Sequence, residues 1–469
     1  MPQDFYSQVV NSRIGGLVAE NVGLPQPVEL DRYEPGEPLI EGEVLLGAAL
    51  GGRLAGPAAR VLAGAGASVR TELEGEVRAA AGDAGLDAGV WNPDAAADVS
   101  FKALVFDATG ISGSDELREL WEFFQPTIRA VEPSGRIIVL GSVPGSCESP
   151  RKATAQRALE GFTRAVGKEV RKGASAQLIQ VDRGAEDAIG STLRFFLSPR
   201  SAYVSGQVAR ITEPVAEIPA LDWDRPLHGK VALVTGASRG IGAAIAEVLS
   251  RDGAHVVGLD VPALETELSE LVGGIGGSAL AVDITEDDAP DRIAEHLASE
   301  HDGVDIVVHN AGVTRDKTLG RMDAERWDLL MDINLSAQER IDDALLTRGL
   351  IRQNGRLVGV SSISGVAGNA GQTNYSTSKA GVIGRVEAMA PVAGAAGVTI
   401  NAVAPGFIET AMTQAMPVPT REAGRRMNSM LQGGLPLDVA EAIAWFASPA
   451  SAGVNGNVVR VCGQSLIGA

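Results

Sequence analysis

An apolar run, a glycine-rich turn and a helix follow one another in Lys230-Val-Ala-Leu-Val-Thr-Gly-Ala-Ser-Arg-Gly-Ile-Gly242 and the residues after it. The apolar run predicts a buried strand, and residues 243–249 predict a helix. Gly236, Gly240 and Gly242 have the spacing GxxxGxG, which permits a tight turn and lets backbone N–H groups approach a pyrophosphate. This order of elements favours a parallel α/β sheet that binds a dinucleotide. A glycine turn without a ligand is the alternative for the motif taken alone.

A serine, a tyrosine and a lysine follow downstream. Ser362 lies thirteen residues before Tyr375, and Lys379 lies four residues after it. A four-residue step places the tyrosine and the lysine on one face of a helix. Because an ammonium beside a phenol favours the phenolate, we expect the tyrosine to exchange a proton nearer neutral pH than a free phenol. The pattern YxxxK also arises by chance on exposed helices, so its weight comes from the glycine turn upstream.

With these motifs, the second half of the chain resembles the short-chain dehydrogenase/reductases and, within them, the 3-oxoacyl (β-ketoacyl) thioester reductases. The matching segments cover nearly all of residues 227–463 in the order of the family: TGASRGIG (235–242), VDIT (282–285), HNAG (309–312), GVTRD (312–316), INLS (333–336), VSSISG (360–365), YSTSK (375–379) and NAVAPGFIET (401–410). GVTRD together with PGFIET favours the ketoacyl subgroup. The resemblance implies a catalytic tetrad of Asn334, Ser362, Tyr375 and Lys379, and no catalytic metal.

The resemblance also implies where a nicotinamide cofactor binds. Asp283 and Ile284 flank the adenine, the segment 310–312 lines the ribose side, and Ile408 with Thr410 holds the carboxamide. The full set of expected cofactor contacts is Gly236, Ser238, Arg239, Gly240, Ile241, Gly242, Asp260, Asp283, Ile284, Asn310, Ala311, Gly312, Tyr375, Lys379, Pro405, Gly406, Ile408 and Thr410.

The choice between NADH and NADPH depends on the end of the second strand. Asp260 lies eighteen residues beyond Gly242, where a carboxylate accepts hydrogen bonds from the adenosine ribose and repels a 2′-phosphate. Arg239 in the glycine turn argues for NADPH. The carboxylate faces the discriminating hydroxyl directly, so we expect NADH to be preferred.

Length and charge set the class of protein. A chain of 469 residues exceeds one ordinary domain, and a net charge of −19 argues against nucleic acid and anionic membranes as partners. No apolar run is long enough to span a bilayer, and the opening MPQDFYSQVV has no basic region typical of a secretory signal. Two cysteines and five histidines show no metal-ligand spacing. We expect a cytoplasmic enzyme.

An internal repeat connects the two halves. Residues 195–211 read against 445–461 with an offset of 250, residues 135–142 against 355–362 with an offset of 220, and residues 42–46 against 229–233 with an offset of 187. Ordered matches of this kind indicate duplication. We therefore expect an α/β fold of two Rossmann-like, doubly wound parallel sheets. Residues 1–222 form a degenerate, nucleotide-free, flavodoxin-like copy, and residues 223–469 form the catalytic domain.

The first copy lacks the residues that carry the chemistry of the second. The offset of 187 replaces the three glycines, and only the serine persists near the expected active centre. In the following helix, a shift of about one residue aligns an alanine with the tyrosine and an arginine with the lysine. The residues opposite those of the second copy are Ala49, Arg53, Ala55, Ser142, Ala153 and Arg157. Without the phenol, the first copy has no proton donor and is expected to be inactive.

The two-domain arrangement resembles the high-molecular-weight class of ketoacyl reductases. In single-domain members of the family, subunits associate through helices beside the active site and through C-terminal strands. A degenerate copy supplies such surfaces within one chain, so we expect a homodimer that mimics a tetramer. The alternative is that the first copy binds an unrelated partner.

The resemblance implies reduction of 3-oxoacyl thioesters in fatty acid biosynthesis. Gln353 and Pro391 occupy positions where reductases that dock acyl carrier protein have arginines, and the chain is acidic, so acyl-CoA is favoured over acyl carrier protein. Four methionines within 412–430 lie in the segment that covers the substrate in this family, and ordinary packing explains them equally well. Two further functions stay open: an NAD-dependent 3-hydroxyacyl-CoA or secondary-alcohol dehydrogenase working oxidatively, and a non-enzymatic scaffold.

Overall fold

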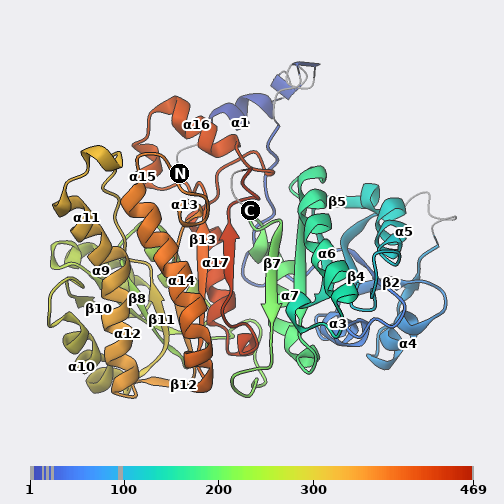
Figure 1. The fold of residues 1–469 in the computed structure, drawn as a ribbon, viewed down its shortest axis with the longest axis horizontal. Helices are drawn as coiled ribbons and strands as arrows, with labels where there is room; N and C mark the ends of the chain where they lie inside the picture. The colour runs from blue at the N-terminus through green and yellow to red at the C-terminus, as the bar shows by residue number, and fades with distance from the viewer. Residues whose placement is uncertain (1–4, 13–14, 17–20, 23–25, 93–98, 467–469) are drawn as a thin grey trace. The chain divides into compact units, whose positions relative to one another are not determined.

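The computed structural model describes residues 5–12, 15–16, 21–22, 26–92 and 99–466, and the chain divides into two compact units (Figure 1). The first unit comprises Met1–Glu213, Val418–Gly433 and Gly463–Leu466. The second comprises Pro214–Pro417, Gly434–Cys462 and Ile467–Ala469. Residues 1–4, which belong to the opening examined for a secretory signal, lie outside the described residues. The expected domain boundary after residue 222 stays a prediction.

The first unit contains a seven-stranded parallel sheet of order β3-β2-β1-β4-β5-β6-β7. Its strands are β1 (Glu43–Ala48), β2 (Ser68–Thr71), β3 (Gly89–Val90), β4 (Phe101–Asp107), β5 (Val131–Ser142), β6 (Ser175–Val181) and β7 (Gln207–Ile211). Its helices are α1 (Phe5–Val10), α3 (Ala55–Ala63), α4 (Glu76–Asp83), α5 (Arg118–Thr127), α6 (Pro150–Glu169), α7 (Gly190–Leu197) and α16 (Val418–Arg426), with short helices η2 (Ile128–Ala130), η3 (Pro144–Ser146), η4 (Glu186–Ile189) and η5 (Pro199–Ser201).

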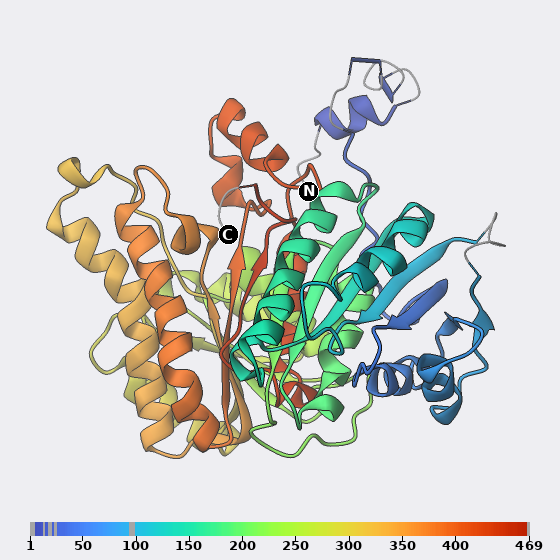
Figure 2. The same ribbon diagram turned by 45° about the vertical axis from the view of Figure 1, so that its right-hand side comes forward.

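Helices cover both faces of this sheet, so its central strands are almost continuously apolar. Leu120 and Phe124 of α5 and Leu159 of α6 pack on one face, against a core that includes Leu104 and Phe106 of β4. In Figure 2, helices lie on both sides of the strands of this unit. Helices α3, α4 and α7 pack on the sheet through β1, β5 and β6. This layering leaves the carboxyl ends of the strands as the open edge, where ligands of such folds bind.

The second unit contains a seven-stranded parallel sheet of order β10-β9-β8-β11-β12-β13-β14. Its strands are β8 (Val231–Thr235), β9 (His255–Asp260), β10 (Ser278–Ala281), β11 (Val304–His309), β12 (Ile351–Val360), β13 (Thr399–Pro405) and β14 (Val458–Val461). Its helices are α8 (Gly240–Arg251), α9 (Glu265–Gly274), α10 (Ala289–His301), α11 (Ala324–Met331), α12 (Ala337–Thr347), α13 (Ile363–Ala367), α14 (Thr373–Ala395), α15 (Ala411–Gln414) and α17 (Pro436–Ala447). Shorter helical segments are η6 (Pro262–Leu264), η7 (Leu319–Arg321), the π-helical η8 (Asp332–Ser336) and η9 (Pro449–Ser451).

Apolar side chains of α10, α12 and α14 bury the core on one face of the second sheet, and α8 packs with α17. In Figure 1, α10, α12 and α14 lie in front of the strands. Among the described helices, none is both long enough and apolar enough to cross a membrane.

The two sheets have the same strand order, as duplication predicts. The repeat extends to single buried residues. Arg136 of β5 and Arg356 of β12 lie 220 positions apart, both are about 1% exposed, and burial lowers the pKa of each guanidinium to about 10. The expected fold class, two Rossmann-like doubly wound sheets, is confirmed.

Candidate functional site

The turn between β8 and α8 forms a backbone cradle at the carboxyl edge of the second sheet. Gly236 has a φ of 66°, which favours glycine, and a Cβ on Gly242 would lie 1.9 Å from the Gly236 carbonyl oxygen. No side chain of the described residues caps the first turn of α8. A helix N-terminus with free N–H groups carries partial positive charge, so the cradle fits a pyrophosphate.

Thr235 and Asn310 fix this cradle to the neighbouring strand. The Asn310 Nδ2 donates to the carbonyl oxygens of Thr235 and Gly236, at 2.9 and 3.0 Å. In return, Thr235 Oγ1 accepts from the backbone N–H groups of Asn310 and Ala311, at 3.1 and 3.0 Å. The sequence did not single out Thr235, although it opens the TGASRGIG motif. Its hydroxyl joins the two loops that are expected to contact the cofactor.

Asp260 lies against the glycine turn. Its Oδ2 accepts hydrogen bonds from the backbone N–H and the hydroxyl of Ser238, at 3.1 and 2.6 Å. Arg239, the N-cap residue of α8, is exposed. The carboxylate and the guanidinium that argue for different cofactors therefore belong to the same edge of the cradle. Asp283, at the end of the adjacent strand, accepts hydrogen bonds from Thr285.

Ser362, Tyr375 and Lys379 meet at the carboxyl end of β12. Ser362 is the N-cap of α13, where its Oγ accepts from the Ser364 N–H at 3.1 Å, and it also hydrogen-bonds the Tyr375 side chain. Helix α14 presents Tyr375 and Lys379 one turn apart. Lys379 Nζ donates to the Val360 carbonyl oxygen at 2.8 Å and lies 5.7 Å from the centroid of the tyrosine ring.

Burial dominates the acid–base properties of this group. It raises the pKa of Tyr375 above its usual range; the hydrogen bond from Ser362 opposes this rise, and the charge of Asp316 adds to it. Burial also lowers the pKa of Lys379 to about 8. The expected lowering of the tyrosine pKa by the lysine is therefore wrong for this structure. Desolvation of the buried phenol is the largest contribution to its pKa.

Asn334 belongs to the same polar group. It is fully buried in the π-helical segment η8, a feature found often at functional sites. Its side-chain amide pairs with the backbone of Val313, at 2.9 and 3.1 Å. A Cβ on Gly312 would lie 3.3 Å from Asn334 Oδ1 and 3.4 Å from Lys379 Nζ. The asparagine and the lysine therefore both border Gly312.

The loop after β13 carries the remaining expected contacts. Pro405 ends the strand, and the Gly406 N–H donates to the Val461 carbonyl at 2.9 Å. Ile408 is 3% exposed, and Thr410 caps α15 through a reciprocal pair of hydrogen bonds with Thr413. The structure thus holds this loop at the carboxyl edge of the sheet.

Two polar features of the second unit were missed from the sequence. Gln372 Nε2 donates to Asp316 Oδ2 at 2.8 Å, and this aspartate acts on the tyrosine pKa. Asp316 lies in the GVTRD motif, which was its only signal. Behind the site, the buried Asp342 contacts His309 Nε2 at 2.9 Å and pairs with Arg385. Although burial opposes ionisation, these two partners keep the pKa of Asp342 below its usual range.

In the first unit, a carboxylate fills the corresponding helix N-terminus. Asp107 ends β4 and is fully buried. Its Oδ2 accepts from the N–H groups of Leu54 and Ala55, at 2.5 and 2.9 Å, and its Oδ1 accepts from the N–H and hydroxyl of Thr109, at 3.0 and 2.6 Å. Burial raises the pKa of Asp107, against these hydrogen bonds. The first turn of α3 already has an internal acceptor where α8 offers free donors.

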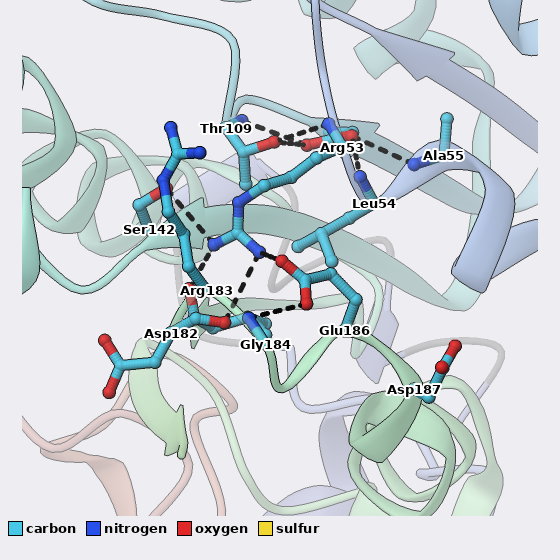
Figure 3. Close-up of polar contacts among 12 residues, drawn as sticks. Arg53, Leu54, Ala55, Thr109, Ser142, Asp182, Arg183, Gly184, Glu186 and Asp187 are labelled. Atoms are coloured by element: carbon cyan, nitrogen blue, oxygen red, sulfur yellow. Dashed lines mark hydrogen bonds and ion pairs between the residues drawn. The ribbon is translucent and has the colours of Figure 1, made fainter. Parts of the chain in front are cut away.

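Arg53 closes the rest of this edge. It occupies the position of Gly240, and its side chain extends across the ends of the strands in Figure 3. The guanidinium pairs with Glu186 and donates to the Val181 carbonyl and, at 3.4 Å, to Ser142 Oγ. The residue that replaces a glycine thus uses the space that the second unit leaves open.

The sequence alignment of α6 with α14 was wrong by one residue. Along α6, Lys152 and Gln156 are buried and Arg157 is exposed, which matches the burial along α14 with an offset of 223. Gln156 Nε2 donates to the Ala108 and Ile111 carbonyls, both at 2.8 Å. Lys152 and Gln156, rather than Ala153 and Arg157, therefore stand opposite Tyr375 and Lys379. The first copy therefore still has no phenol at the position opposite Tyr375.

The second half of the chain is similar to known proteins. Residues 236–463 match the family model described as enoyl-(acyl carrier protein) reductase. Over 237 residues the chain is 42% identical to the 3-oxoacyl-[acyl-carrier-protein] reductase FabG of Vibrio cholerae serotype O1, covering 50% of this chain and 97% of that protein. It is 38% identical to the protein of the same name from Escherichia coli K12 over 236 residues, with the same coverage, and 37% identical to that of Thermotoga maritima over 246 residues, covering 51% and 99%.

The chain therefore belongs to the short-chain dehydrogenase/reductase family. Within that family, its C-terminal half is homologous to the 3-oxoacyl-[acyl-carrier-protein] reductases. Within the described ranges, no group of three or more His, Cys, Asp or Glu side chains is arranged to hold a metal ion.

The two helix N-termini lead to a prediction about cofactor stoichiometry. Titration calorimetry should give one NADH per chain, and Gly240→Asp, which places a carboxylate at the α8 N-terminus, should abolish it. Asp107→Ala should not add a second site, because Arg53 still fills the edge. It should lower the free energy of unfolding by about 2 kcal/mol, because buried N–H groups lose their acceptor. Asp115→Ala, an exposed aspartate of the same unit, is the matched control and should change little. Binding of two NADH molecules per wild-type chain would contradict the conclusion that Asp107 and Arg53 fill the corresponding site of the first unit.

Proposed function

We propose that the chain reduces 3-oxoacyl thioesters to 3-hydroxyacyl thioesters with a reduced nicotinamide dinucleotide, in fatty acid biosynthesis. The observation that carries this proposal is the convergence of Ser362, Tyr375 and Lys379 at the carboxyl end of β12. The relatives, which are named 3-oxoacyl-[acyl-carrier-protein] reductases, support the same substrate class. The expected cytoplasmic location and homodimer are part of the proposal.

The residues act on the keto oxygen of the substrate. When bound, the reduced nicotinamide supplies a hydride to the keto carbon. Ser362 and Tyr375 donate hydrogen bonds to the oxygen, where negative charge develops. The tyrosine then transfers its hydroxyl proton to that oxygen and is left as a phenolate. The raised pKa of Tyr375 keeps the proton on the phenol until the oxygen becomes basic.

Lys379 and Asn334 restore the starting state. With a nicotinamide dinucleotide bound, the lysine ammonium would hold its ribose, and it would stabilise the phenolate. Because burial lowers the lysine pKa to about 8, the lysine gives a proton to the Tyr375 phenolate more readily than an exposed lysine would. Asn334, which borders Gly312 together with Lys379, holds a water that then returns a proton to the lysine.

The proposed cofactor is NADH. Asp260 already accepts two hydrogen bonds from Ser238, so its carboxylate is fixed beside the turn. A 2′-phosphate about 4 Å from that carboxylate would cost roughly 1 kcal/mol per unit-charge pair in water and about 4 kcal/mol at a partly desolvated surface. Arg239 is exposed, so solvent screens its opposing attraction.

The proposed acyl carrier is coenzyme A, with acyl carrier protein as the second choice. Gln353 is exposed and uncharged, and a net charge of −19 disfavours an acidic partner. The name of the relatives, 3-oxoacyl-[acyl-carrier-protein] reductase, favours acyl carrier protein. Competition between acetoacetyl-CoA and an acetoacetyl carrier protein in one assay distinguishes the two.

Tyr375→Phe tests the proposed chemistry. The change removes the proton donor and keeps the ring, so the rate of acetoacetyl-CoA reduction, followed at 340 nm, should fall about 10³-fold while NADH affinity is unchanged. Tyr33→Phe in the first unit is the matched control and should keep full activity. Near wild-type turnover of Tyr375→Phe would refute the mechanism. Running the assay with 3-hydroxybutyryl-CoA and NAD measures the oxidative direction.

Asp260→Ser tests cofactor choice. The wild type should show at least tenfold higher kcat/KM with NADH than with NADPH, because the carboxylate repels the 2′-phosphate. The variant removes this charge and should narrow the ratio. Asp291→Ser is the control, since that exposed carboxylate belongs to α10 and pairs with Arg348, away from the expected cofactor contacts. A wild-type preference for NADPH would show that Arg239 dominates.

The lowered pKa of Lys379 predicts the pH profile. Reduction uses the cationic lysine, and burial lowers its pKa to about 8. Activity is therefore present below that pKa and lost as the pH rises through it, so kcat/KM should be constant near pH 6–7 and fall above about pH 8. Residual activity of Lys379→Arg, which stays cationic, should lack this fall. A flat wild-type profile up to pH 10 would contradict the assignment.

A further inference from the structure

Three charged or titratable side chains meet in the core of the second unit. Asp342 of α12 is fully buried; its Oδ1 lies 2.9 Å from His309 Nε2, and its Oδ2 pairs with Arg385 of α14. The side chains of His309 and Arg385 are 2% and 10% exposed. These three residues, termed the charged trio, join the end of β11 to α12 and α14.

The first unit places a phenylalanine opposite His309. Phe106 of β4 pairs in register with Val139 of β5. His309 of β11 pairs with Gly359 of β12, and the offset of 220 between β5 and β12 places Val139 opposite Gly359. Phe106 and His309 therefore occupy equivalent positions near the ends of equivalent strands.

The other two members of the charged trio also have a phenylalanine opposite them. Along α6 and α14, the offset of 223 places Phe162 opposite Arg385. Along α5 and α12, an offset of 218 aligns the buried positions and places Phe124 opposite Asp342. The buried residues that this offset aligns are Leu120 with Gln338, Phe124 with Asp342 and Thr127 with Leu345.

The three phenylalanines, termed the aromatic trio, make the same contacts as the charged trio. The centroid of the Phe124 ring lies 5.8 Å from that of Phe106 and 5.1 Å from that of Phe162. Phe124 thus has the central place that Asp342 has in the second unit. Each trio connects one strand to two equivalent helices on one face of its sheet.

Packing alone does not explain why the second unit has charges here. The aromatic trio shows that apolar side chains join these three elements in a sheet of the same strand order. A buried carboxylate loses its hydration, and replacing a buried ion pair by apolar residues of similar volume is often neutral or stabilising. The fold therefore does not require the charged trio, and its directional contacts indicate a role in the site.

The charged trio lies directly behind the loop that joins the glycine turn. His309 precedes Asn310, whose Nδ2 donates to the carbonyl oxygens of Thr235 and Gly236 at 2.9 and 3.0 Å. Because an ionised carboxylate only accepts hydrogen bonds, Asp342 requires a proton on His309 Nε2 and fixes the orientation of that ring. A phenylalanine at this position would pack but would have no such directional bond.

The residue that follows each strand member of the two trios agrees with this difference. In the first unit, Phe106 precedes Asp107, which is the acceptor for the N–H groups of α3. In the second unit, His309 precedes Asn310, which binds a turn whose helix has no side-chain cap among the described residues. The charged trio thus belongs to the copy whose turn fits an external anion.

We propose that Asp342 is a positioning residue for the nicotinamide dinucleotide. Held by Arg385, it fixes His309 and thereby the loop of Asn310, so that the glycine turn is preformed for the pyrophosphate. This role rests on the function proposed above, which assigns the turn to the cofactor. Because Asp342 is buried behind the site, its loss should weaken dinucleotide binding and leave the chemical step unchanged.

Transplanting the aromatic trio separates positioning from packing. A triple variant, His309→Phe with Asp342→Phe and Arg385→Phe, gives the second unit the side chains that the first unit packs at these positions. Titration calorimetry should show the Kd for NADH raised about tenfold, with kcat for acetoacetyl-CoA at saturating NADH within about twofold of the wild type. The midpoint of thermal unfolding should fall by no more than about 3 °C.

Two single substitutions at Arg385 test the charge without adding volume at Asp342. Arg385→Lys keeps a cation beside the carboxylate, so the Kd for NADH should stay within about twofold of the wild type. Arg385→Met keeps a long side chain but removes the charge, so the Kd should rise about fivefold. Arg348→Met is the matched control, because it removes an exposed arginine that pairs with Asp291, and it should leave the Kd unchanged.

Each outcome supports or overturns the proposal. An unchanged Kd for NADH in a folded triple variant would overturn the positioning role, and equal Kd values for Arg385→Lys and Arg385→Met would overturn the role of the charge. A lower kcat with an unchanged Kd would assign the charged trio to the chemical step and would also contradict the proposal. If the triple variant does not fold, the two Arg385 variants decide.

The same measurements keep this role apart from the proposed function. A wild type that binds NADH but does not reduce acetoacetyl-CoA refutes the proposed function alone, and the Kd values of the variants still test Asp342. A wild type that binds neither NADH nor NADPH overturns both.

Discussion

The unsatisfied N–H groups at the start of the first helix of each unit determine what each unit can do. Such groups need an acceptor, and the helix dipole favours an anionic one. In the second unit, the glycine turn leaves the donors of α8 without a side-chain cap among the described residues. In the first, Asp107 supplies the acceptor from the neighbouring strand. The same strand order therefore gives one unit suited to an external anion and one that is complete by itself.

Backbone groups, more than side-chain charges, organise the site of the second unit. Lys379 binds a strand carbonyl, Asn334 binds the backbone of Val313, and Asn310 binds the carbonyls of the glycine turn. These contacts fix polar side chains in a buried environment, where desolvation sets the pKa values of the tyrosine and the lysine. A serine, a tyrosine and a lysine thus gain their properties from the packing around them.

Local patterns in the sequence predicted the fold, whereas contacts between residues far apart in the sequence were not predicted. The strand–turn–helix pattern at 230–249 and the repeat offsets predicted both sheets, because both patterns are read from residues that are close together in the sequence. The alignment of α6 failed because one residue turns a helix by about 100°, and its alanine-rich sequence does not fix the register. Asp107 was missed because its partner Leu54 is 53 residues away.

The internal carboxylate also bears on how the two copies can change over generations. A mutation of Arg53 to glycine would not restore an anion site, because Asp107 would still satisfy α3. It would also remove the ion pair between Arg53 and Glu186. A mutation of Asp107 alone would leave the buried N–H groups of Leu54 and Thr109 without an acceptor. Each of these two substitutions, at Arg53 and at Asp107, is therefore unfavourable when it occurs alone. Divergence of the first copy is therefore difficult to reverse. Selection can refine its new contacts, but a return to a nucleotide site would need more than one substitution at the same time.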